Sequence, residues 1–447
     1  MRVLAILLLL CGALNSIAQQ KILISNVQIF DGRSEKTING HVLVEGNIIR
    51  KVSASPIPTD KSGQTTLIDG KGKFLMPGLI DAHTHVMMES LSMQALMVSD
   101  IEFITVAAVT SVERDLMQGF TTFRDLAGPS FGLKRAIDMG MIPGPRIYPS
   151  GAMISQTAGH GDFLMPQDVP RDPGAPLAYA ERHNLGIIAD GPDEVLKRSR
   201  EQLRLGASQL KLAAGGGVSS NYDPLDVAQY SEEEFRAAVL AADNWGTYVT
   251  VHAYTPRAVQ MALRAGVRCI DHGQLIDDAT AKMIAEKNAW LSLQPFVEEE
   301  NSAFAPGSAN YIKQQQMRRG TDSAFILAKK YKIKTAFGTD ILFDAAKANQ
   351  RGQELTKMLR WYSPFEILRM ATSVNAELLS MSGPRNPYPG KLGVIEEGAY
   401  ADLLIVDGNP LQNLTLLEKT QESLLLIMKN GQIYKNRLVG DAERVKR

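Results

Sequence analysis

The segment Pro77-Gly78-Leu79-Ile80-Asp81-Ala82-His83-Thr84-His85 joins an apolar run to two histidines that are one residue apart. The apolar part predicts a buried β-strand, and side chains two residues apart on a strand point to the same side. His83 and His85 can therefore project together from the end of this strand and chelate one metal ion. The chain has only 7 histidines, so two unrelated surface histidines are the less favoured interpretation.

Around this segment, from residue 77 to residue 387, short apolar strands alternate with helix-period segments. The strand candidates are Gly78–His83, Phe120–Leu126, Arg146–Gly151, Ser208–Ala213, Tyr248–Tyr254, Cys269–Gly273, Ala289–Pro295 and Thr335–Asp340. The helix candidates between them include Pro192–Leu205, Ser231–Trp245, Pro256–Ala265 and Asp277–Lys287. Ser231 and Glu234 form a capping box at the start of one helix. Eight alternating strands predict an α/β fold, a (β/α)8 TIM barrel.

Both ends of the mature chain carry β signals instead. Residues 19–76 and 388–447 hold short apolar runs, at 22–24, 27–30, 41–44, 66–68, 401–406 and 424–428. Turn dipeptides separate them, at Asp31-Gly32, Asn39-Gly40, Glu45-Gly46, Asp69-Gly70 and Asn430-Gly431. We expect one small β-sandwich domain built from both ends beside the barrel.

Residues 1–18 have the features of a secretory signal peptide. Arg2 precedes the apolar run Leu4–Leu10, and small residues precede a cleavage point after Ala18. A membrane anchor is the alternative, but the run is shorter than the about 20 apolar residues that span a bilayer. Cys11, after the bulky Leu10, is a poor lipoprotein site. The sequence predicts an exported protein, periplasmic or secreted, with no membrane attachment after cleavage and with Cys269 as its only cysteine.

Composition and charge narrow the function. Apolar residues make up 45% of the chain, and 48 basic residues balance 48 acidic ones. This is a globular composition without the basic excess that nucleic-acid binding favours, so we expect no nucleic-acid partner. The connection 152–191 has little periodicity and is rich in Gly, Pro and Asp. A loop of this length is usually functional.

More metal-ligand types stand at the ends of the later predicted strands. His252, His272 and Asp340 each end a strand, and the strand ends of a (β/α)8 barrel meet at one rim. A lone histidine there would more often be structural, but four histidines and a carboxylate together favour zinc or a related ion. Lys211 lies inside an apolar strand. It either reaches solvent or carries a carbamate that could bridge two cations, and spacing alone leaves both open.

These residues resemble the amidohydrolase superfamily. The matching features are the His-X-His of strand 1, Lys211 of strand 4, His252 and His272 of strands 5 and 6, Asp340 of strand 8 and the flank Gly398-Ala399-Tyr400-Ala401-Asp402-Leu403. The resemblance covers nearly the whole mature chain. The chain looks most like the branch of imidazolonepropionase-like proteins, Xaa-Pro dipeptidases, metallocarboxypeptidases and ochratoxinase. That similarity rests on Lys211–Gly217, His252-Ala253-Tyr254 and Gly159-His160-Gly161-Asp162.

The resemblance implies two divalent metal ions, most simply Zn²⁺, and a carboxylated Lys211 between them. His83, His85, Lys211 and Asp340 would hold one ion, and Lys211, His252 and His272 the other; a homo-oligomer is also implied. Two such ions share a hydroxide that attacks an amide carbonyl, while Asp340 carries its proton to the leaving nitrogen. Tyr254 is a candidate oxyanion donor and His160, between two glycines, a candidate substrate contact. Barrel packing and a plain loop histidine are the alternatives.

The expected reaction is hydrolysis of an amide next to a free carboxylate, in a dipeptide such as Xaa-Pro or an N-acyl amino acid, including ochratoxin-like amides. Arg124 and Arg257 are possible clamps for that carboxylate. One alternative is cyclic-amide hydrolysis (imidazolonepropionase- or lactamase-like) or heterocycle deamination on the same scaffold. Lys211 argues against it, because imidazolonepropionase and the deaminases of the superfamily resemble single-metal enzymes that lack a bridging lysine. A non-catalytic barrel is a further alternative, which would not need the ligand set.

Overall fold

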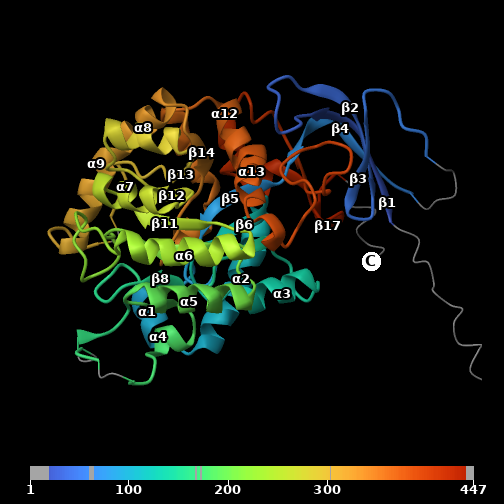
Figure 1. The fold of residues 1–447 in the computed structure, drawn as a ribbon. Coiled ribbons are helices and arrows are strands. Elements are labelled where there is room, and N and C mark those ends of the chain that lie inside the picture. The colour runs from blue at the N-terminus through green and yellow to red at the C-terminus, as the bar shows by residue number, and fades with distance from the viewer. Residues whose placement is uncertain (1–19, 60–64, 167–168, 172–173, 303, 439–447) are drawn as a thin grey trace, which may run out of the picture.

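The structure is a computed structural model that describes residues 20–59, 65–166, 169–171, 174–302 and 304–438. The predicted signal peptide and the cleavage point after Ala18 lie outside these residues. Figure 1 shows the barrel with its surrounding helices and, beside it, a sheet to which both chain ends contribute. Within the described residues, no helix combines the length and the apolar character that crossing a membrane requires.

The strands are β1 (Lys21–Ile29), β2 (Ile38–Glu45), β3 (Ile48–Ser53), β4 (Thr65–Pro77), β5 (Leu79–Thr84), β6 (Phe120–Asp125), β7 (Arg146–Pro149), β8 (Met153–Ser155), β9 (Gly186–Ile188), β10 (Leu210–Ala213), β11 (Val249–Ala253), β12 (Cys269–His272), β13 (Trp290–Leu293), β14 (Lys334–Phe337), β15 (Leu403–Val406), β16 (Leu424–Lys429) and β17 (Gln432–Asn436).

The helices are α1 (Met93–Val98), α2 (Ile101–Met117), α3 (Phe131–Asp138), α4 (Tyr179–Arg182), α5 (Pro192–Leu205), α6 (Glu232–Trp245), α7 (Pro256–Ala265), α8 (Asp278–Glu286), α9 (Ala309–Lys330), α10 (Ala345–Ala348), α11 (Gly352–Lys357), α12 (Pro364–Arg369), α13 (Asn375–Ser380) and α14 (Thr420–Ser423). Short 3-10 or π segments lie at η2 (Met358–Arg360), η3 (Met370–Val374), η4 (Gly383–Arg385) and η5 (Leu414–Leu417).

The barrel strands confirm the predicted fold class. Parallel pairing joins β5, β6 and β7 in one sheet and β8 with β10 through β14 in another. Two short strands, β7 and β8, together form the third strand of the barrel, because β7 pairs with β6 whereas β8 pairs with β10. Gly151, at φ +74°, lies between these two short strands. At the other seam, the Asp340 N–H donates to the His83 carbonyl at 2.9 Å, which links the end of β14 to β5.

The barrel strands are buried on both faces, as parallel sheets covered by helices are. Each strand residue from β10 to β13 is buried, and most of the apolar side chains among them belong to the main hydrophobic core. The Ser231 capping box begins α6 as predicted, because its hydroxyl accepts from the Glu234 N–H and Glu234 accepts from the Ser231 N–H. Gly246, at φ +69°, ends that helix in the left-handed conformation that glycine adopts without strain.

One loop prediction and one strand boundary need correction. The connection 152–191 is not structureless, since β8, α4 and β9 lie within it, and β8 and β9 pair in parallel. Strands of three residues are too short to show a period in the sequence. The strand predicted to end at Asp340 ends at Phe337 instead. Asp340 has φ +50°, which an extended strand cannot contain.

The second sheet has the strand order β17-β16-β15-β4-β1-β2-β3, so both chain ends build it. It folds back on itself, because the Ile49 N–H donates to the Ala399 carbonyl and the Ala401 N–H to the Asn47 carbonyl. The enclosed apolar cluster makes it sandwich-like, as predicted. Asn430-Gly431 is the predicted hairpin turn, with φ +55° and +74°.

Two of the turns predicted for this sheet are wrong. Asn39-Gly40 lies within β2 and Asp69-Gly70 within β4. A Cβ on Gly70 would meet Val27 at 2.2 Å, so this glycine permits close contact between paired strands at a register shift. A glycine that marks a bulge and one that marks a turn look alike in sequence.

Candidate active site

The six predicted metal ligands lie at one rim of the barrel, near the carboxyl ends of its strands. They are His83 in β5, His85 just beyond it, Lys211 in β10, His252 in β11, His272 at the end of β12 and Asp340 beyond β14. All except Asp340 are buried, and the Asp340 side chain is 12% exposed. The structure therefore brings together the side chains that the sequence placed on separate strands.

Three histidines surround the carboxylate of Asp340. Its Oδ1 lies 3.1 Å from Nε2 of His85 and 3.3 Å from Nε2 of His83. Its Oδ2 lies 3.9 Å from Nδ1 of His272. His252 extends this group, because its ring centroid is 4.4 Å from that of His272.

The backbone is left-handed at two of these ligands. His272 has φ +79° and Asp340 has φ +50°, a conformation that costs a non-glycine residue on the order of 1–3 kcal/mol. Neighbouring strands hold both positions, since the Asp340 N–H donates to His83 and the N–H of Gly273 donates to the Ala253 carbonyl at 2.8 Å. Backbone strain of this kind is concentrated at functional sites.

The donor set fits a divalent metal ion. Single ligand atoms of His83, His272 and Asp340 lie within 4.8 Å of one another. His83 Nε2 and Asp340 Oδ1 are buried and lack a hydrogen-bond partner. Burial, with Lys211 nearby, holds the pKa of His83 well below its ordinary value, and burial lowers the pKa of His272 to about 4. Both imidazoles are therefore neutral at pH 7, the form that binds metal.

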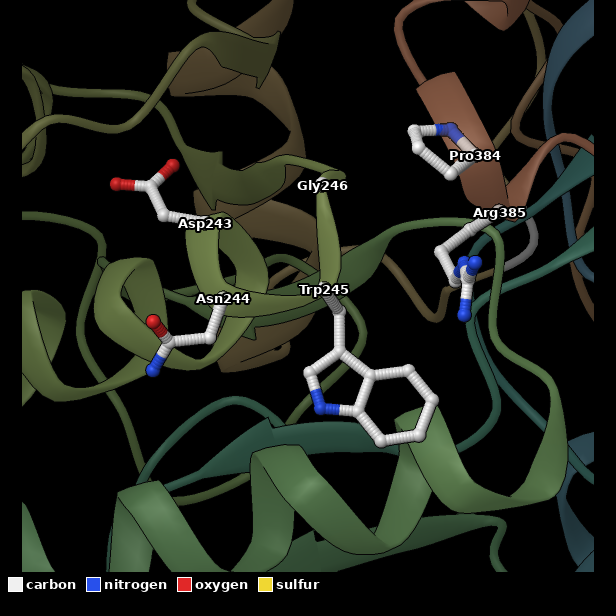
Figure 2. A pocket seen from close by; sticks show the side chains of 6 residues that line it. All are labelled: Asp243, Asn244, Trp245, Gly246, Pro384 and Arg385. Carbon is white, nitrogen blue, oxygen red and sulfur yellow. The ribbon is translucent and has the colours of Figure 1, made fainter.

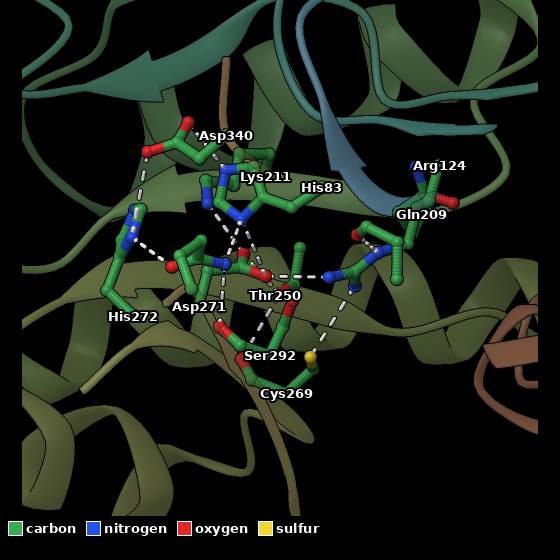
Figure 3. Close-up of polar contacts among 12 residues, drawn as sticks. His83, Arg124, Gln209, Lys211, Thr250, Cys269, Asp271, His272, Ser292 and Asp340 are labelled. Carbon is green, nitrogen blue, oxygen red and sulfur yellow. Dashed lines mark hydrogen bonds and ion pairs between the residues drawn. The ribbon is translucent and has the colours of Figure 1, made fainter. Parts of the chain in front are cut away.

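Lys211 is fully buried and forms an ion pair that the sequence did not predict. Its Nζ lies 2.6 Å from Oδ2 of Asp271, which also accepts from the Thr250 hydroxyl at 2.7 Å. Arg124 donates to Oδ1 of the same carboxylate at 2.6 Å (Figure 3). Burial lowers the pKa of Lys211, although Asp271 opposes this effect.

Arg124 is not a substrate clamp, so that prediction is wrong. Its guanidinium is fully buried, and its donors are used by the Ala82 carbonyl, Tyr248, Cys269 and Asp271. Two cations within predicted strands, Arg124 and Lys211, were a sequence signal that a buried anion compensates them, but they did not identify that anion as Asp271. The other predicted clamp, Arg257, is exposed near the start of α7, and its role stays a prediction.

Gln294 is a second residue that sequence reasoning missed. Its side-chain oxygen lies 2.8 Å from Nδ1 of His272, and its nitrogen lies 3.2 Å from Nδ1 of His83. One amide therefore fixes the orientation of two candidate ligands, a common arrangement around metal sites. No motif marks it, because it follows β13 in a segment without other ligand types.

A buried ion cluster supports the seam between β5 and β14. Asp81 accepts hydrogen bonds from the backbone of His83 and from the backbone and hydroxyl of Thr339. Arg351, fully buried, contacts Asp81 at 2.8 Å and also binds Glu89 and Asp115. Asp81 therefore connects a candidate ligand on the first strand with the residue that precedes Asp340.

Tyr254 lies at the rim where the sequence placed it, and His160 lies beside the same histidines, while the roles expected for both stay predictions. The His160 ring stacks on His252 with centroids 4.0 Å apart, and its Nδ1 lies 2.8 Å from the Ser220 hydroxyl. Burial lowers the pKa of His160 to about 4. A Cβ on Gly217 would meet the His160 ring at 1.9 Å, so the glycine is required there. The Tyr254 ring lies 5.1 Å from that of His272.

A shallow hollow of about 550 Å³ lies elsewhere, between the end of α6 and η4 (Figure 2). Its lining residues are Asp243, Asn244, Trp245, Gly246, Pro384 and Arg385. The end of α6 leads into the start of β11, so this hollow is at the barrel end opposite the histidines. It contains no histidine and lacks the convergence of ligand types seen at the rim, so we assign it no catalytic role.

A (β/α)8 barrel whose rim gathers four histidines, a buried lysine and an aspartate defines a barrel enzyme with a candidate metal centre. The chain belongs to the amidohydrolase family, whose pattern matches residues 74–434. Members are typically metal-dependent, and the His83, His272 and Asp340 group agrees with this. The chain is a hydrolase that acts on carbon–nitrogen bonds.

Similar proteins with known structure or name support this assignment. Ochratoxinase of Aspergillus niger is 28% identical over 425 residues, covering 92% of this chain and 86% of that protein. A prolidase crystallised with N-methylphosphonate-L-proline is 31% identical, covers 93% of this chain and 100% of its own, and superposes with a TM-score of 0.83. An Xaa-Pro dipeptidase with bound methionine is 27% identical over 93% and 100% of the two chains, with a TM-score of 0.79.

Proposed function

We propose that this protein is an exported binuclear-metal amidohydrolase that cleaves an amide next to a free carboxylate. The substrate would be a dipeptide such as Xaa-Pro or an N-acyl amino acid, including ochratoxin-like amides. The observation that carries the proposal is the convergence of His83, His85 and His272 on Asp340, together with the buried Lys211.

His83, His85, Lys211 and Asp340 would hold one ion, and Lys211, His252 and His272 the other. Neutral imidazoles and an ionised carboxylate suit Zn²⁺. When bound, two such ions supply a hydroxide nucleophile at neutral pH and polarise the carbonyl oxygen. Burial of Lys211 favours the neutral amine that captures carbon dioxide, whereas Asp271 favours the ammonium. Arg124 and Thr250 would still satisfy Asp271 once Lys211 is carboxylated.

Asp340 is suited to carry the proton. Burial would raise the pKa of its carboxyl, but the nearby His85, His272 and Lys211 more than offset this, so the pKa is below its ordinary value. Asp340 is therefore ionised at neutral pH and can accept a proton at Oδ1 or Oδ2. Delivering that proton to the leaving nitrogen completes amide cleavage, because an unprotonated amine leaves badly.

Tyr254 would donate a hydrogen bond to the developing oxyanion. Burial, with Asp340 nearby, holds the pKa of its phenol well above the ordinary value, so the donor proton stays in place. The neutral ring of His160, which stacks on His252, would contact the substrate. We expect the partners to be small molecules or dipeptides and the enzyme to be a homo-oligomer.

The test is a screen of the metal-loaded enzyme against dipeptides, N-acyl amino acids and their carboxyl-blocked amides, read as released amine. We expect cleavage of free carboxylates and a loss of kcat/KM when the carboxylate is blocked. Equal rates on blocked and free substrates would instead favour a lactamase or a broad amidase. If the metal-loaded enzyme hydrolyses none of these compounds, the proposal is refuted.

Export is tested separately. Cleavage after Ala18 predicts that the mature protein begins at Gln19. N-terminal sequencing of the protein recovered from the periplasm or medium checks this. A chain that keeps Met1 and stays in the cytoplasm would contradict it.

A further inference from the structure

Lys347 places a cation beside the candidate site. It belongs to α10, which follows Asp340 closely, and its side chain is 29% exposed. Its Nζ lies 3.5 Å from the carboxylate of Glu354 and 3.7 Å from that of Glu300. Both distances exceed the roughly 2.7–2.9 Å of a charge-assisted hydrogen bond. Lys347 therefore forms two long ion pairs with these acids.

The two acids already have other cations. Lys357 binds Glu300 closely and lies 2.7 Å from Glu354, and Arg318 lies 3.5 Å from Glu300. Three cations thus share two carboxylates, which leaves one positive charge without a matching anion in this cluster. Among the described residues, no further carboxylate lies within ion-pair distance of Lys347.

The positive charge of Lys347 interacts electrostatically with Asp340. Burial alone would lower the pKa of its ammonium, but Glu354, Glu300 and Asp340 raise it above the ordinary value. The group is therefore charged at neutral pH and lies within electrostatic range of Asp340. The Lys347 ammonium would therefore also attract the carboxylate of a substrate whose amide lies beside Asp340.

An apolar surface connects the lysine with the histidines. The Lys347 ammonium is 5.6 Å from the ring centroid of Phe296, which packs in a cluster with Tyr254 and Met317. Tyr254 in turn lies 4.9 Å from the ring of His252. Apolar walls with a few placed charges are typical of ligand sites.

We propose that Lys347 binds the free carboxylate of the substrate and that the cluster around Phe296 and Tyr254 receives the apolar side chain of the same residue. This inference rests on the proposed amide hydrolysis and names its substrate class: amides of apolar amino acids with a free carboxyl group. Two other cations are less suited. Lys313 already donates to the carbonyls of Ser220 and Asp223, and Arg257 is exposed.

The experiment uses the metal-loaded enzyme with N-acetyl-L-phenylalanine, N-acetyl-L-phenylalaninamide and N-acetyl-L-glutamate, read as the amine released from each. The variants are Lys347→Gln, Lys347→Arg and, as a matched control, Lys282→Gln. Lys282 lies on α8 with its side chain 62% exposed. Lys347→Gln leaves two cations with two carboxylates, so we expect it to fold; its melting temperature and metal content should match the wild type.

For Lys347→Gln we expect kcat/KM on N-acetyl-L-phenylalanine to fall about 10- to 100-fold, mainly through KM, because a charged hydrogen bond is lost. The blocked amide should change by less than about twofold. Lys347→Arg should recover most of the loss, Lys282→Gln should behave as wild type, and wild type should prefer phenylalanine to glutamate.

An equal loss on free and blocked substrates, or no loss, would overturn the role of Lys347. A preference for N-acetyl-L-glutamate would overturn the apolar pocket. Wild-type enzyme that cleaves none of these amides would instead refute the proposed function, so the two failures are distinguishable.

Discussion

Replacing Arg124 with methionine tests whether this buried arginine supports the site rather than binding substrate. Methionine fills similar space but donates no hydrogen bond, so Asp271 would keep its hydrogen bonds from Lys211 and Thr250 but lose the one from Arg124. Breaking a buried ion pair costs about 3–5 kcal/mol. An unfolding entropy of about 2.1 cal/mol/K per residue gives about 0.9 kcal/mol/K for this chain. The melting temperature should therefore fall by about 3–5 °C.

Calorimetry and steady-state kinetics on the metal-loaded variant check this. Arg236→Met is the control, because its guanidinium is 56% exposed and pairs with Glu232 on the surface, an arrangement worth about 0–1 kcal/mol. Free and carboxyl-blocked substrates should lose activity by the same factor in Arg124→Met. An unchanged melting temperature together with a raised KM for free carboxylates alone would refute this reasoning and restore Arg124 as a substrate clamp.

Three further outcomes follow from the same geometry. Lys211→Ala should lose activity and bridging metal together, with partial rescue by a small carboxylic acid; normal activity would exclude the bridging role. Asp340→Asn should keep most metal by elemental analysis but lower kcat by several orders of magnitude; an unchanged kcat would exclude it as the proton carrier. In the metal-free protein, burial holds the pKa values of His272 and His160 at about 4. At a higher pH these two histidines can therefore bind protons in the unfolded state while they stay neutral in the folded state. The free energy of unfolding should be highest above pH 6.5 and should fall by about 3 kcal/mol per histidine towards pH 4. Denaturant titrations of His160→Gln should show a smaller dependence on pH.

The barrel could be predicted from sequence because its strands are short, apolar and separated by helices with clear caps. Ser231 with Glu234 and the hairpin at Asn430-Gly431 show that local chemistry is sufficient at such places. The split of the third strand at Gly151 and the three-residue strands β8 and β9 could not be predicted, because three residues carry no period. Asn39-Gly40 was misleading, since a glycine within a strand resembles a glycine in a turn.

The candidate ligands were predictable because each lies within a predicted strand or near its carboxyl end, and the fold brings these strand ends together. Their supporting residues were not, because Asp271, Gln294 and Arg351 act through contacts between segments distant in sequence. Arg124 shows this limit most clearly. Its charge within an apolar strand was visible in the sequence, but whether it binds substrate or a buried aspartate depends on a partner 147 residues away.

Metal titration tests the central claim most directly. Protein freed of metal by a chelator would be reloaded with Zn²⁺ in the presence of bicarbonate, while bound metal and hydrolysis of an N-acyl amino acid are measured together. We expect about two ions per chain and full activity only when the second has bound. Activity that is complete with one ion per chain, or that is independent of added metal, would contradict the binuclear amidohydrolase proposed for this rim.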